Sequence, residues 1–110
     1  RDVNGISIAT RLLDDVPAKE LKPLVDSLKR QINSGVVAVV AVSEGKASLV
    51  VGVTDDLTGR VNAIDLVRAG SNAVGGKGGG GRPDMAQAGG PDGAAGGEAL
   101  KAIVEALALA

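Results

Sequence analysis

The chain has 110 residues, with 12 Lys and Arg against 13 Asp and Glu, so no overall positive field attracts nucleic acid to it. It contains no cysteine and no histidine, which excludes disulfides, thiolate metal sites and the commonest general base. Aromatic residues are also absent, so any contact with RNA must use backbone, cations, amides and aliphatic surface.

The first half of the chain predicts a strand, a helix and a hairpin. Residues 5–10 alternate apolar and polar side chains, as a half-buried strand does. Apolar residues then recur at helical spacing from 21 to 32, and Gly35 is expected to end this helix in a left-handed conformation. Two valine-rich runs, 36–42 and 47–53, are separated by only four residues, which permits antiparallel neighbours alone.

The second half predicts a helix, a loop, a short strand and a last helix. Asn62 is a good cap for a helix that reaches Ala73, where a glycine-rich loop begins. A strand is expected over residues 84–88 and a helix from about Glu98. The predicted fold is therefore a single small α/β domain over residues 1–110 with a mixed sheet. Its order is strand, helix, strand, strand, helix, glycine loop, strand, helix.

The glycine-rich segment 75–90 is the candidate binding site. A run of glycines lets the backbone approach another molecule and lets successive N–H groups converge on an anion, and the flanking cations suit a phosphate. Taken alone, the glycines favour a flexible linker. Arg82 also fits a solvated loop cation, Asp84 a turn residue and Gln87 a structural hydrogen bond. The candidate RNA-binding residues are Lys77, Gly78, Gly79, Gly80, Gly81, Arg82, Asp84 and Gln87.

Other motifs give weaker signals. Residues 76–81 formally satisfy G-x-G-x-x-G, but a dinucleotide fold needs a strand before the motif and a helix after it, the reverse of the predicted order. No Ser or Thr follows Lys77, so there is no Walker A loop. The acidic pairs 14–15 and 55–56 are interpreted as turn and cap residues, not metal ligands. We interpret Lys19, Lys22, Lys29 and Arg30 as a solvated helix face.

The segment GGKGGGGRPDMAQAGG closely resembles the signature of the C-terminal domain of bacterial alanyl-tRNA synthetases, a version of the DHH-associated substrate-binding domain. Ser43-Glu44-Gly45 between the valine-rich runs and Gly59-Arg60-Val61-Asn62-Ala63 at the start of a helix come in the family's order. The resemblance covers roughly residues 5–108.

This resemblance implies a non-catalytic module that binds tRNA(Ala) at its elbow and helps to link aminoacylation with editing. It implies a cytoplasmic parent ligase that uses ATP, magnesium and zinc. Neither cofactor nor metal is expected in this part of the parent. The implied partners are tRNA and the other domains of the synthetase, with homo-oligomers formed through an upstream helical segment. No apolar run is long enough for a membrane span, and because the chain begins with Arg1 we expect it to be a fragment.

Two alternatives remain open at this point. DHH phosphoesterases carry a related substrate-binding domain, but with Gly-Gly-His where this chain has Gly80-Gly81-Arg82. A free-standing alanyl-tRNA editing protein with the same tail is the other. The sequence upstream would discriminate them, because each parent carries its own catalytic motifs.

Overall fold

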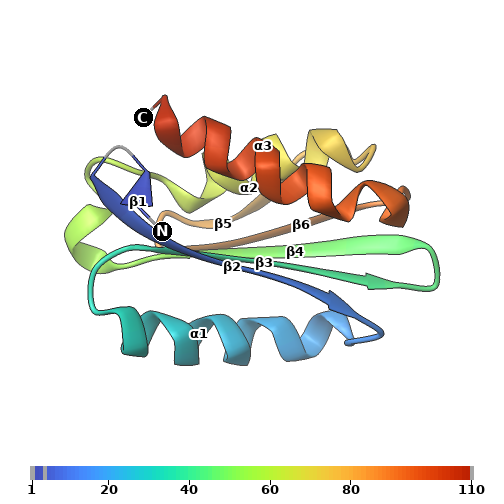
Figure 1. The fold of residues 1–110 in the computed structure, drawn as a ribbon, viewed down its shortest axis with the longest axis horizontal. Helices are drawn as coiled ribbons and strands as arrows, with labels where there is room; N and C mark the ends of the chain where they lie inside the picture. The colour runs from blue at the N-terminus through green and yellow to red at the C-terminus, as the bar shows by residue number, and fades with distance from the viewer. Residues whose placement is uncertain (1, 4, 110) are drawn as a thin grey trace.

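A mixed six-stranded sheet organises the chain in the computed structural model, which describes residues 2–3 and 5–109. Helix α1 covers one face of the sheet, and α2 and α3 cover the other (Figure 1). The strands lie in the order β1-β2-β3-β4-β6-β5. The strands are β1 (Asp2–Val3), β2 (Ile6–Asp14), β3 (Val36–Ser43), β4 (Lys46–Val53), β5 (Gly79–Arg82) and β6 (Met85–Gly90). The helices are α1 (Leu21–Ile32), α2 (Ala63–Ala73) and α3 (Gly96–Ala108), with short 3₁₀ turns at 18–20, 55–57 and 93–95.

The connections determine which strands run parallel. β2 and β3 are parallel, and α1 makes the crossover between them, while all other neighbours are antiparallel. The β3–β4 hairpin turns at Glu44 (φ 54°) and Gly45 (φ 77°), both left-handed, as tight hairpin turns require. The predicted fold class and the antiparallel hairpin are confirmed.

Two apolar layers form the core because β3 and β4 are covered on both faces. Val37, Val39 and Ala41 pack towards α1, while the alternate residues of β3 pack towards α2 and α3. Ile103 and Leu107 fix α3 over this second layer and are fully buried. No helix within residues 2–3 and 5–109 has the combination of length and hydropathy needed to span a bilayer.

The N-terminal elements differ in detail from the prediction. The structure adds β1, and β2 continues to Asp14 beyond the predicted end at residue 10. The left-handed residue that ends α1 is Asn33 (φ 64°), not Gly35 as predicted. Gly35 is instead required by close packing, because a Cβ atom there would lie 2.5 Å from the carbonyl oxygen of Ser7.

The glycine-rich segment contains a strand that the sequence does not predict. Residues 79–82 form β5, which pairs with β6 around the turn at Pro83 and Asp84. β6 also extends through Gly90, and α3 begins at Gly96. Glycine has no side chain whose alternation could indicate a strand, so only pairing with β6 makes this one visible.

Candidate functional site

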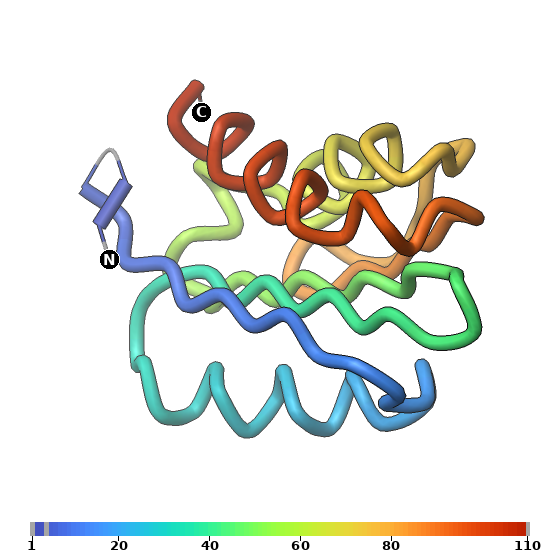
Figure 2. Tube along the Cα trace, turned by 45° about the vertical axis from the view of Figure 1, so that its right-hand side comes forward, coloured from blue at the N-terminus to red at the C-terminus, as the bar shows by residue number. Residues whose placement is uncertain are grey.

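One face of the sheet is only partly covered, and three of the eight candidate residues lie there. Helix α1 packs against β3 and β4 (Figure 2). Gln87 on β6 lies opposite Val50, which faces α1, and Gly80 on β5 lies opposite Gln87. Arg82 lies opposite Met85, which also packs towards α1. Gly80, Arg82 and Gln87 are all exposed, and we call this row of three residues the open face.

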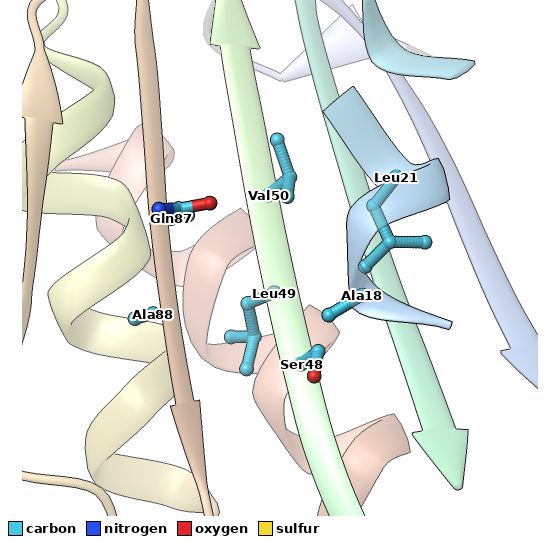
Figure 3. A pocket seen from close by; sticks show the side chains of 7 residues that line it. All are labelled: Ala18, Leu21, Ser48, Leu49, Val50, Gln87 and Ala88. Carbon is cyan, nitrogen blue, oxygen red and sulfur yellow. The ribbon is translucent and has the colours of Figure 1, made fainter. Parts of the chain in front are cut away.

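A shallow depression of about 360 Å³ adjoins the open face between the start of α1 and strands β4 and β6 (Figure 3). Gln87 has the longest polar side chain among the residues that line this depression, and it lies beside apolar groups from Leu21 and Val50. Within the described residues the side chain of Gln87 makes no hydrogen bond, so the structural role left open by the sequence is not observed. Its amide is free to pair with a ligand. The lining residues are Ala18, Leu21, Ser48, Leu49, Val50, Gln87 and Ala88.

The two cations that flank the glycines are attached at opposite ends of β5. Lys77 precedes β5 and Arg82 ends it, and a strand that advances about 3.3 Å per residue separates Gly79 from Arg82 by about 10 Å. Peptide groups of an extended strand also alternate in direction. Residues 79–82 therefore do not form the anion-binding cradle expected from the sequence. The arrangement suits two separate contacts along an extended ligand.

The glycines of this segment serve different purposes. A Cβ atom on Gly79 would lie 2.5 Å from the Cβ of Ala88, and one on Gly81 would lie 2.5 Å from the carbonyl oxygen of Met85. Added atoms on Gly78 and Gly80 would meet nothing within 4 Å. The backbone of β5 is therefore packed on one side and bare on the other, and Gly80 is the bare position on the open face.

The turn after β5 places Arg82 by contacts from several elements. The Pro83 carbonyl accepts a hydrogen bond from the Ala63 amide at 2.9 Å, and the Asp84 carbonyl accepts one from the Val53 amide at 2.8 Å. The Asp84 carboxylate lies 3.5 Å from Nε of Arg82, whose side chain is 76% exposed. Asp84 is thus both the predicted turn residue and the ion-pair partner of the candidate cation.

Two polar residues of α2 that the sequence did not single out hold the glycine segment in place. Arg68 Nε donates to the Gly79 carbonyl at 3.2 Å and remains exposed beside β5. The buried Ser71 hydroxyl lies 3.2 Å from the Gly78 carbonyl and 3.1 Å from the Gly89 carbonyl. Arg68 and Ser71 are three residues apart, a spacing that indicates only that both lie on the same face of α2. Nothing in the sequence indicates that this face meets the glycines.

Apart from Asp14, which is the last residue of β2, the paired acidic residues lie in turns, as predicted. Asp14 ends β2 and Asp15 follows it in a left-handed conformation, while Asp55 and Asp56 lie in a 3₁₀ turn. The hydrogen bond that Ser34 donates lowers the pKa of the Asp56 carboxyl, and Thr54 adds to this effect. The described residues contain no group of three acidic side chains placed to hold a metal ion.

Known proteins resemble the chain over nearly its full length. The sequence matches the DHHA1 domain family over residues 5–109. It is 62% identical over 107 residues to the alanine–tRNA ligase of Granulibacter bethesdensis, covering 97% of this chain and 12% of that protein. It is 58% identical, with the same coverage, to the alanine–tRNA ligase of Paramagnetospirillum magneticum. The chain thus spans about 12% of the length of these relatives.

A solved structure gives the same result. The crystal structure of the C-Ala domain from Aquifex aeolicus alanyl-tRNA synthetase superposes with a TM-score of 0.90 at 30% identity, covering 98% of this chain and 96% of that one. The resemblance predicted from the sequence is confirmed. RecJ from Thermus thermophilus, crystallised with Mg²⁺, superposes over 91% of this chain and 14% of its own with a TM-score of 0.57. At 19% identity, this likeness to RecJ extends to the fold alone.

Proposed function

We propose that this chain, which belongs to the DHHA1 domain family, is a tRNA-binding module of an alanine–tRNA ligase and contacts RNA through β5 and the open face. The observation that carries the proposal is the row of Gly80, Arg82 and Gln87. It combines bare backbone, a cation that is 76% exposed and an amide without a partner among the described residues. Arg82 would hold a phosphate or a base edge, Gln87 a base edge, and Lys77 a second phosphate.

The likeness to C-Ala and ligase relatives supports a more specific form of the proposal. The module contacts the elbow of tRNA(Ala) and so helps the aminoacylation and editing sites of one synthetase to use the same bound tRNA. A second attachment point acts by raising the effective concentration of the tRNA near both sites. Catalysis, with ATP, magnesium and zinc, belongs to the other domains of this cytoplasmic parent. Homo-oligomerisation belongs to a helical segment upstream.

Replacing Arg82 tests the site. Arg82→Ala should weaken binding of a tRNA(Ala) transcript by about 1–3 kcal/mol, because a charge-assisted contact is lost. Fluorescence anisotropy with labelled tRNA gives the dissociation constant. Arg11→Ala is the matched control, since Arg11 is exposed on the same face but on β2, about 20 Å across the sheet. Equal affinity for the Arg82→Ala and Arg11→Ala chains would reject this site.

The choice of RNA tests the elbow. An RNA made of the acceptor and T arms retains the duplex but lacks the D arm, so it cannot form the elbow. Binding to this RNA should be weaker than to whole tRNA, and poly-pyrimidine RNA should compete poorly, because no aromatic platform holds unstacked bases. Equal affinity for the three RNAs would be compatible with RNA binding but would contradict the proposed contact with the tRNA elbow.

A further inference from the structure

Lys29 of helix α1 contacts the turn that follows β5. Its ammonium donates a hydrogen bond to the Asp84 carbonyl at 3.2 Å and lies 3.9 Å from the Asp84 carboxylate. Lys29 is 15% exposed, unlike a solvated lysine, so the sequence-based interpretation of this residue as part of a solvated face is wrong. Because α1 and β4 cover most of this side chain, it is poorly placed to touch RNA itself.

The fold provides a path for this side chain across the sheet. Lys29 crosses β4 at Gly52, where an added Cβ atom would lie 2.7 Å from Lys29 Cδ and 2.6 Å from Val25 Cγ1. Any larger residue at 52 would displace the lysine stem from the sheet. The absence of a side chain at Gly52 therefore allows the ammonium to reach the turn between β5 and β6.

The contacts then continue to the guanidinium of Arg82. Asp84 places one carboxylate oxygen towards Lys29 and the other 3.5 Å from Arg82 Nε. A partner at Nε leaves the two terminal nitrogens of the guanidinium for an outside anion. Lys29 offsets the charge of Asp84, so that this carboxylate orients Arg82 without neutralising the local positive charge.

We propose that Lys29 is a positioning residue for RNA binding, which acts by fixing Asp84 and thereby the guanidinium of Arg82. The proposal rests on the proposed function, since it assumes that Arg82 meets RNA. It differs from a direct contact in one respect: the effect of Lys29 on binding must pass through Arg82.

A double-mutant cycle measures this dependence. Lys29→Met keeps the apolar stem and removes the ammonium, and it should weaken tRNA(Ala) binding about three- to tenfold. In the Arg82→Ala background the same change should have no further effect. Lys22→Met, an equal loss of charge at an exposed position of α1, should leave affinity within about twofold, and Lys29→Arg should restore most of it. The same loss from Lys29→Met in both backgrounds would overturn the proposal.

A measurement without RNA separates this proposal from the proposed function. The Nε–H signal of Arg82, assigned by its disappearance in Arg82→Ala, should exchange faster with water in Lys29→Met than in the unaltered chain. Unchanged exchange would overturn the positioning role even if Arg82 binds tRNA. Faster exchange together with unaltered tRNA affinity in Arg82→Ala would instead count against the proposed function. Lys29→Gln provides the same comparison if the Met variant does not fold.

Discussion

Individual glycines of β5 are not interchangeable, although the sequence presents them as a uniform run. Gly79 and Gly81 have no room for a Cβ atom because the backbone or side chains of β6 already occupy that space. Gly80 faces the open side, where an added atom meets nothing within 4 Å. Under the proposed function, Gly80 matters for the close approach of RNA and not for the stability of the fold.

Alanine at these positions separates the two roles. Gly79→Ala should destabilise the chain by about 1–3 kcal/mol, as overpacking does. Gly80→Ala should change the free energy of unfolding by less than about 0.5 kcal/mol but weaken tRNA binding, because the methyl group blocks close approach. Since the chain has no aromatic residue, unfolding in urea is followed by far-UV circular dichroism. Unaltered tRNA affinity in Gly80→Ala would show that no ligand approaches this strand closely.

Contacts between α2 and the β5–β6 hairpin determine where the glycine segment lies. The buried side chain of Ser71 lies between the Gly78 and Gly89 carbonyls. Its hydroxyl carries a single proton, which can be donated to either carbonyl oxygen. Gly76 has no space for a side chain, because a Cβ atom would lie 2.1 Å from both Ser71 Oγ and the Gly89 carbonyl oxygen. The segment is thus fixed to α2 at its start, and it does not behave as a free linker.

Removing the Ser71 hydroxyl tests this attachment. Ser71→Ala should lower the free energy of unfolding by about 1–3 kcal/mol, because the partly buried Gly78 and Gly89 carbonyls lose the hydroxyl that donates to them. The urea midpoint measured by circular dichroism gives the change. The matched control is Ser48→Ala, which removes a half-buried hydroxyl with no partner among the described residues. A midpoint shift no larger than the control's would show that helix and hairpin are held by packing alone.

The elements that the sequence predicts correctly are those whose side chains carry the pattern. The valine-rich runs indicate β3 and β4, and Asn62 caps α2 as expected, its Oδ1 accepting from the Ile64 amide at 2.8 Å. β5 has no such pattern because it contains three glycines. The reach of Lys29 to Asp84 joins residues 55 positions apart, and only the folded sheet brings them together. The sequence therefore predicts the elements whose side chains carry a pattern, and it misses β5 and the contacts that support the glycine segment.

For the whole molecule, the balance of charge limits how RNA binding can work. The formal net charge is −1, so attraction to RNA must come from a few local cations. Lys77, Arg68 and Arg82 lie on or beside the glycine segment and are exposed. They lie at the β5 edge of the sheet, whereas Arg11 lies across the sheet on β2. The proposed interface is accordingly small and defined more by shape than by charge.

Salt dependence tests this view of the interface. Each phosphate neutralised contributes about −0.7 to −0.9 to the slope of the logarithm of the binding constant against that of salt concentration. Contacts through two or three cations therefore predict a slope of about −1.4 to −2.7. Lys77→Ala should make the slope shallower by the contribution of about one phosphate contact. Lys101→Ala, an exposed position of α3 beside Thr10 of β2, should leave the slope unchanged. Anisotropy titrations of tRNA(Ala) over a series of KCl concentrations measure these slopes. A slope steeper than about −6 would require many more phosphate contacts than this face can offer, and the RNA would then have to bind over a broader surface than β5 and the open face.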